Sequence, residues 1–219
     1  MKRLELGGLL SDGFRYTTTP KAIVRVIALG VLHSLSFLMI IPFFFALGYV
    51  YRCIKGTIEG SEGPPEYRDW GGMFIDGLKL FVAYLIIVIP IVLITFLTGV
   101  PLRFKAILNP YAMIISMTSI YIASFIIGIL AGLYLFMAIP HMIYVGKVGA
   151  VFSFSEVLER IRKIGYGDYL AICIVTLILV WLLVLVGSLI PIIGVILIIP
   201  IAILLLARVQ GLVFKSTIG

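Results

Sequence analysis

Long apolar stretches, interrupted by short polar segments, set the pattern of this sequence. The apolar stretches cover residues 22–54, 78–98, 111–145, 168–188 and 195–214. A helix needs about 20 consecutive apolar residues to cross a bilayer core. The stretches lack the alternation of apolar and polar positions that marks the strands of a membrane barrel. The pattern therefore predicts an all-α fold, a polytopic transmembrane helix bundle formed by a single membrane domain over residues 1–219.

Three polar segments predict helices or loops at the membrane surface. They cover residues 1–21, 55–77 and 146–167. The second begins as a proline-rich loop and becomes an amphipathic entry to the next span, with Asp69 placed to cap that helix. The third has apolar residues on one helical face and basic residues at its end. That pattern is typical of an amphipathic helix lying on anionic headgroups.

The first apolar stretch, residues 22–54, is too long for one upright span and too short for two. A polar break interrupts its middle, and a proline there removes a helical hydrogen bond. The residues of this break are His33, Ser34, Ser36 and Pro42. Two interpretations follow. The stretch forms a short hairpin that enters and leaves the membrane on one side, or it forms one tilted and kinked span.

The distribution of lysine and arginine favours the hairpin. Setting aside Arg25 inside the stretch, a hairpin leaves every basic residue except Arg103 and Lys105 on one side of the membrane. A single span would move the basic residues of the N-terminal segment to the other side. Because basic loops mark the cytoplasmic face, we expect both termini and both long polar segments to be cytoplasmic, in a multi-pass protein of the cell membrane.

Two further patterns concern how the helices pack. The run IIPFFFALGYVYR in the first stretch resembles IIPIAILLLAR in the last, which leads to the hypothesis of three helical-hairpin units. Small residues recur at a four-residue spacing along residues 111–145, where they would let helices approach closely in lipid, within one chain or between chains. These small residues are Ala112, Ser116, Ser124, Gly128 and Gly132.

Three motifs carry a family resemblance: ALGYVYRCIKG, PPEYRDWGGMFIDGLK and VFSFSEVLERIRKIGYGDYL. With them, nearly the whole chain resembles the archaeal integral membrane proteins of the domain-of-unknown-function 4013 family. The residues that carry the resemblance are Gly48, Tyr49, Arg52, Asp69, Trp70, Gly71, Asp76, Gly77, Lys79, Phe154, Gly167 and Asp168. The resemblance implies a membrane location and an archaeal source, and it supplies no activity.

The composition leaves little room for catalytic chemistry. The chain is 62% hydrophobic and 12% charged, whereas soluble domains carry about 25% charged residues. Its two cysteines and two histidines are isolated from one another. No HExxH, GxSxG, phosphate-loop or paired-cysteine motif occurs in the sequence. We therefore expect no enzymatic activity, no cofactor, no metal site and no binding of nucleic acid.

The candidate contact residues lie in the polar segments. Asp76 and Lys79 are three positions apart and can face each other on one side of a helix. The residues that we expect to contact lipids or partners are Trp70, Asp76, Lys79, Arg160, Arg162 and Lys163.

These residues favour a non-catalytic scaffold or accessory protein that binds anionic membrane lipids, a membrane-protein partner or a second copy of itself. The alternative is a small channel or transporter, as a single chain or as an oligomer, in which the polar break of residues 22–54 forms the site.

Accessibility labelling tests the hairpin directly. A hairpin places positions 2 and 60 on the same side of the membrane, so Lys2→Cys and Gly60→Cys should react with an impermeant maleimide from the same side of sealed vesicles. The background chain carries Cys53→Ala and Cys173→Ala. Labelling of the two positions from opposite sides would show that residues 22–54 cross the membrane once.

Overall fold

The computed structural model describes residues 5–36, 40–106, 110–190 and 192–218. Within these ranges the chain is helical and contains no strand, which confirms the all-α prediction. The helices are α1 (Leu6–Thr18), α2 (Pro20–Ser36), α3 (Ile40–Glu59), α4 (Trp70–Ala106), α5 (Pro110–Val145), α6 (Phe154–Ile164), α7 (Tyr166–Leu189) and α8 (Ile199–Lys215). A short 3₁₀-helix, Val148–Phe152, precedes α6, and a π-helical turn, Gly194–Ile198, leads into α8.

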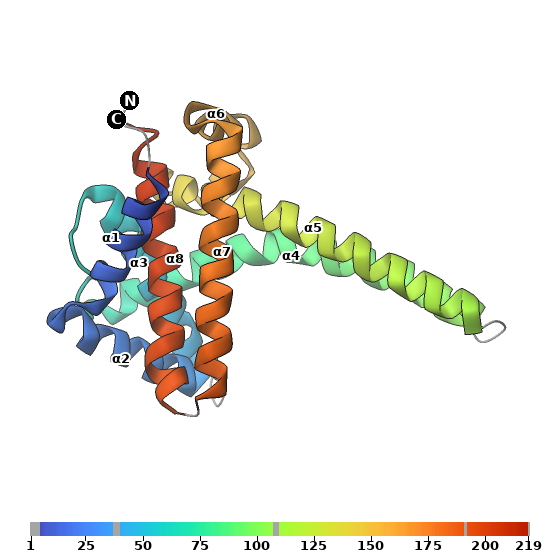
Figure 1. The fold of residues 1–219 in the computed structure, drawn as a ribbon, viewed down its shortest axis with the longest axis horizontal. Helices are drawn as coiled ribbons and strands as arrows, with labels where there is room; N and C mark the ends of the chain where they lie inside the picture. Colours follow the sequence, from blue (N-terminus) through green and yellow to red (C-terminus); the bar gives the residue numbers. More distant parts are fainter. Residues whose placement is uncertain (1–4, 37–39, 107–109, 191, 219) are drawn as a thin grey trace.

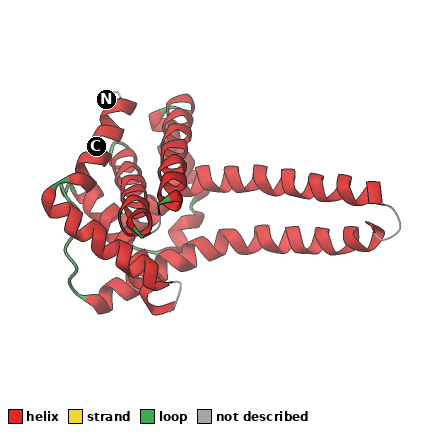
Figure 2. Cartoon of the chain, turned by 60° about the horizontal axis from the view of Figure 1, so that its bottom comes forward, coloured by secondary structure: helices red, strands yellow, loops and turns green. Residues whose placement is uncertain are grey.

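Helices α4 and α5 lie side by side and leave the rest of the molecule as a long arm (Figure 1, Figure 2). They contain 37 and 36 residues, so each is about 55 Å long at 1.5 Å per residue. The other helices form a bundle in which α8 contacts α1, α3 and α7. The arm runs across the direction of α7 and α8 (Figure 1).

Three helical segments among the described residues are long and apolar enough to cross a membrane. They are Thr118–Val145 within α5, all of α7, and Gly194–Lys215. With 28, 24 and 22 residues, each is longer than an upright crossing needs, so each can cross at a tilt. Many large apolar side chains of these segments are exposed, including Phe125, Leu130, Ile178, Trp181 and Leu189. Because contact of such surfaces with water is unfavourable, the fold is that of a membrane protein.

The connection between the two arm helices is shorter than the sequence indicates. The span expected at residues 78–98 lies inside α4, and the loop expected at residues 100–110 is helical as far as Ala106, while Pro110 begins α5. Leucine, arginine, lysine and alanine between residues 102 and 106 are good helix formers. Continuing the helix also keeps backbone groups bonded in apolar surroundings.

Within the first apolar stretch, residues 22–36 belong to α2 and residues 40–54 belong to α3, and the two helices contact each other. Arg25 of α2 donates a hydrogen bond to the Pro64 carbonyl, and the Tyr49 hydroxyl of α3 donates one to the Pro65 carbonyl at 2.9 Å. Arg25 and Tyr49 therefore lie against the same loop, one well before the connection between the helices and the other well after it. This places α2 and α3 antiparallel, as in the hairpin interpretation. Entry of this hairpin into the membrane stays a prediction.

Two of the small residues of α5, Gly128 and Gly132, have open space beside them. A Cβ atom added to Gly128 or Gly132 would meet nothing within 4 Å. The side chains of Ala112 and Ser116 lie outside the described part of the structure. Packing of this stripe between chains stays a prediction.

Two glycines allow α3 and α4 to cross at close range. A Cβ atom on Gly48 would lie 1.8 Å from the Met73 carbonyl oxygen, and one on Gly77 would lie 1.9 Å from the Phe44 carbonyl oxygen. Both distances are far inside van der Waals contact, so neither position has room for a side chain. The Phe44 ring also packs edge-on against Phe81, with the ring centroids 5.3 Å apart.

Alanine at Gly77 should therefore separate α3 from α4. Overpacking of this kind costs about 1–3 kcal/mol, so we expect Gly77→Ala to lower the thermal unfolding midpoint of the detergent-solubilised protein by several degrees. Gly128→Ala is the matched control, because the added methyl group has open space and alanine favours the helix. Equal midpoints for the two variants, measured by scanning fluorimetry, would contradict the crossing.

Candidate functional site at the charged end of the bundle

Polar segments that are far apart in the sequence meet at one end of the bundle. Arg208 of α8 contacts Asp12 of α1 and the Ser61 carbonyl in the loop after α3. Arg160 of α6 contacts Thr217 in the C-terminal tail. Figure 1 shows α6 and both chain ends at this end of the molecule. We call the region around Asp12, Ser61, Arg160, Arg208 and Thr217 the charged end.

Arg52 of α3 lies at the centre of an ion-pair network with α4. Its Nε atom lies 3.1 Å from Asp76 Oδ2, and its Nη2 atom lies 3.1 Å from Asp69 Oδ2. It also donates hydrogen bonds to the Arg68 and Asp69 carbonyls. Since its side chain is only 18% exposed, these bonds compensate much of the cost of removing the guanidinium from water.

The predicted contact between Asp76 and Lys79 is present. Lys79 Nζ lies 3.3 Å from Asp76 Oδ1, while the other carboxylate oxygen of Asp76 accepts from Arg52. Sequence spacing identifies Lys79 as a partner but not Arg52, which is on another helix. Asp76 therefore ties α3 to α4 and serves the helix crossing.

Asp69 begins α4 as the sequence indicates. Its Oδ1 atom accepts a hydrogen bond from the Gly72 backbone N–H at 3.1 Å, which satisfies a donor in the first turn of the helix. A polar cleft of about 540 Å³ opens beside this turn. Its lining includes Arg52, Lys55, Glu59, Glu66, Arg68, Asp69 and Asp76. Most of these charges pair with one another, so the cleft has the character of an ion-pair network.

Trp70, the first residue of α4, belongs to an aromatic group and is half exposed. Its ring packs edge-on against Phe45 and stacks on Tyr67, with centroids 5.3 Å and 5.9 Å apart. Tyr67 also stacks on Tyr49 at 4.1 Å. Burial raises the pKa of the Tyr67 phenol, which therefore stays neutral. Together these rings hold the loop before α4 against α3.

Arg208 forms a largely buried ion pair at the charged end. Its side chain is 8% exposed, and its Nε atom lies 2.8 Å from Asp12 Oδ2. It also donates to Thr57 Oγ1 and to the Ser61 carbonyl at 3.4 and 2.6 Å. Its guanidinium lies 4.6 Å from the centre of the Tyr16 ring. Arg208 thus joins α1 and α3 to α8.

His141 and Arg160 join α6 to the bundle. The Arg160 Nε donates to His141 Nδ1 at 3.1 Å, so the neutral imidazole carries its proton on Nε2. That Nε2 atom lies 3.2 Å from Glu156 Oε2 without the alignment of a hydrogen bond. The Arg160 guanidinium also lies 4.6 Å from the centre of the Phe214 ring. These contacts fix α6 against α5 and the end of α8.

The three predicted basic residues of α6 have different environments. Arg160 points into the bundle, whereas Arg162 and Lys163 are exposed in the last turn of the helix. Val157 and Ile161 are buried on the opposite face. Of these three residues, Arg162 and Lys163 are therefore exposed enough to reach headgroups or a partner.

The polar break in the first stretch has a local explanation for most of its residues. Ser34 Oγ donates to the Gly30 carbonyl at 2.8 Å, and Ser36 Oγ donates to the Leu32 carbonyl at 2.7 Å. Both hydroxyls are thus bonded within α2. His33 is partly buried on the same helix. Pro42, the last residue of the predicted break, lies in the first turn of α3, where proline is tolerated.

No group of three or more histidine, cysteine, aspartate or glutamate side chains has the geometry of a metal site within the described ranges. Cys53 and Cys173 are both buried and unpaired with each other.

The family model described as protein of unknown function (DUF4013) matches residues 34–192. The chain belongs to the DUF4013 family. The matched range runs from the end of α2 through the arm and α6 to just beyond α7. No curated protein and no solved structure matches the chain.

In this DUF4013 protein, several residues that carry the resemblance hold α3 and α4 together. Gly48 and Gly77 permit the close crossing, and Arg52 pairs with Asp69 and Asp76. The motif around residues 48–79 therefore encodes a helix junction.

A double-mutant comparison tests the Arg208–Asp12 pair. Asp12→Asn leaves the buried guanidinium without its counter-charge and should destabilise the protein by about 3–5 kcal/mol. The double variant Asp12→Leu/Arg208→Met removes both charges and should recover much of that loss. Arg15→Gln is the control, because Arg15 is 79% exposed and lies 3.5 Å from the same carboxylate, where a pair contributes at most about 1 kcal/mol. Similar unfolding free energies for Asp12→Asn and Arg15→Gln would refute the buried pair.

Proposed function

We propose that this DUF4013 protein is a non-catalytic membrane scaffold or accessory protein that binds anionic lipid headgroups through α6. The observation that supports the proposal is that one set of α6 side chains contacts the bundle while another set is exposed. Val157, Ile161 and Arg160 attach it to the bundle, while Arg162 and Lys163 remain exposed. A helix held in this way presents two cations at a fixed place beside the apolar helices.

The charges of α6 suit a membrane surface. Arg162 and Lys163 lie in the last helical turn, where cations complement the helix dipole. Lys163 pairs with Glu159 at 3.7 Å, but both side chains are half or more exposed, so the pair contributes little and can open for a phosphate. A basic residue near an anionic leaflet contributes about 1 kcal/mol of attraction.

The same reasoning supports a cytoplasmic position for the charged end, because basic segments are retained there. Both chain ends, the loop after α3 and α6 would then face the cytoplasm. We further propose an archaeal source for the chain, with a membrane-protein partner or a second copy as binding partners and no nucleic acid. The alternative of a channel or transporter gains no support from Ser34 and Ser36, whose hydroxyls bond to their own helix.

Charge removal on α6 tests the lipid-binding proposal. Two cations at about 1 kcal/mol each correspond to roughly a 30-fold change in affinity. Arg162→Gln/Lys163→Gln should therefore weaken binding of phosphatidylglycerol by about 10- to 30-fold, measured by native mass spectrometry of the detergent-solubilised protein. Phosphatidylcholine binding should stay unchanged. Arg160 is left intact because its substitution would detach α6.

The matched control is Arg15→Gln/Lys21→Gln, which removes the same charge from two exposed positions outside α6. It should retain most of the phosphatidylglycerol affinity. Equal losses in the two double variants would show a general charge effect, and no preference for phosphatidylglycerol in the wild-type protein would reject the proposal.

A further inference from the structure

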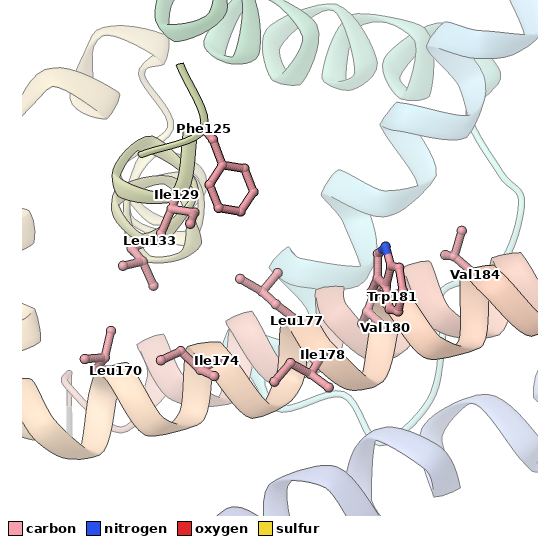
Figure 3. Close-up of a pocket in the computed structure, with 10 residues that line it drawn as sticks. All are labelled: Phe125, Ile129, Leu133, Leu170, Ile174, Leu177, Ile178, Val180, Trp181 and Val184. Carbon is pink, nitrogen blue, oxygen red and sulfur yellow. The ribbon is translucent and has the colours of Figure 1, made fainter. Parts of the chain in front are cut away.

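A hollow of about 620 Å³ lies between α5 and α7 (Figure 3). Its lining residues are Phe125, Ile129, Leu133, Leu170, Ile174, Leu177, Ile178, Val180, Trp181 and Val184. The side chains of Figure 3 come from both helices and border a common space.

The hollow follows from the way the two helices meet. Tyr169 of α7 donates a hydrogen bond to the Leu133 carbonyl of α5 at 2.6 Å, and its ring packs edge-on against Phe136 at 6.1 Å. This contact fixes the helices together near the start of α7. Beyond it the arm and α7 run in different directions (Figure 1), so their side chains separate and leave a wedge-shaped space.

The chemistry of the lining fits hydrocarbon. Every lining side chain is apolar apart from the indole N–H of Trp181. Both walls belong to segments that are long and apolar enough to cross a membrane. The space is therefore expected at the depth of lipid chains, where a polar ligand would lose its hydration without finding hydrogen bonds.

The size of the hollow distinguishes between its apolar occupants. From Leu170 to Val184 it follows α7 for about 21 Å at 1.5 Å per residue. A helix about 10 Å wide over that length would fill roughly 1,600 Å³, which exceeds the volume of the hollow, so a partner helix would lie in it only in part. A lipid chain is much thinner and its length is matched to half of a bilayer core, about 15 Å.

We propose that the wedge between α5 and α7 is a binding site for one acyl chain of a membrane lipid. The chain fills the space that the diverging helices cannot fill with their own side chains. The site is separate from the headgroup site on α6 and recognises the hydrocarbon part of the lipid. The protein would therefore retain a lipid molecule when it leaves the membrane.

Filling the wedge with a side chain tests the proposal. Leu177→Trp places a bulky ring in the wedge, and Leu182→Trp places the same ring on α7 outside it; Leu177 and Leu182 are 39% and 46% exposed. Lipid retained after extensive detergent exchange is quantified with dipalmitoyl phosphatidylcholine as the probe. We expect Leu177→Trp to retain at least threefold less than the wild type, and Leu182→Trp to match the wild type.

A second measurement uses Trp181 itself and needs no variant in the wedge. In the Trp70→Phe protein, Trp181 is the one remaining tryptophan. Titration with a phosphatidylcholine carrying a brominated acyl chain should quench its fluorescence saturably, at about one lipid per protein. Arg162→Gln/Lys163→Gln should leave this quenching unchanged, which separates the chain site from the headgroup proposal.

Three results would overturn the acyl-chain site. The first is equal lipid retention by the Leu177→Trp variant and the wild type. The second is quenching of Trp181 fluorescence that rises linearly with lipid and does not saturate. The third is a wild-type dimer that the Leu177→Trp variant no longer forms, with lipid retention unchanged. The last result would identify a second copy of the chain as the occupant. Absence of retained lipid in the wild-type protein would also overturn the acyl-chain site.

Discussion

Unpaired polar groups are very costly in hydrocarbon, and this cost decides where the charged side chains of this protein lie. Along the arm and in α7 and α8, hydrogen bonds within each helix pair the backbone N–H and C=O groups, and most side chains are apolar. Charged side chains gather instead at the charged end and beside the start of α4, where they pair. Arg52 and Arg208 show the result, since each is largely buried and meets a carboxylate from another helix.

Because of this constraint, the buried ion pairs hold particular helices together. Arg208 holds α1 to α8, Arg52 holds α3 to α4, and Arg160 holds α6 to α5 and the chain end. In lipid, apolar contact alone discriminates poorly between helix arrangements, because lipid chains are as apolar as the side chains. Directional bonds at the ends of helices therefore fix which helices become neighbours. The exposed cations of α6 are then held at one place relative to the apolar helices.

The sequence predicts the helices well because long apolar stretches have few alternative structures. Local partners are also readable, as Asp76 with Lys79 and Asp69 with Gly72 show. Partners from distant segments are not readable. The sequence therefore shows no partner for Arg208, does not pair Arg52 with Asp76, and places Arg160 with the residues expected to contact lipids or partners. The helical end of α4 was missed because Gly99 and Pro101 resemble a stop signal, although the residues that follow favour a helix. No sequence pattern reveals the wedge between α5 and α7, because it arises from the angle between helices.

We infer that hydrocarbon surrounds α7 while the end of α6 lies in the headgroup region. Spin labels at Leu182→Cys and Arg162→Cys, in a chain with Cys53→Ala and Cys173→Ala reconstituted into bilayers, measure this most directly. We expect the label at position 182 to collide with oxygen and to be shielded from a water-soluble nickel complex, while the label at position 162 shows the reverse. Equal accessibility of both labels to the nickel complex would contradict it.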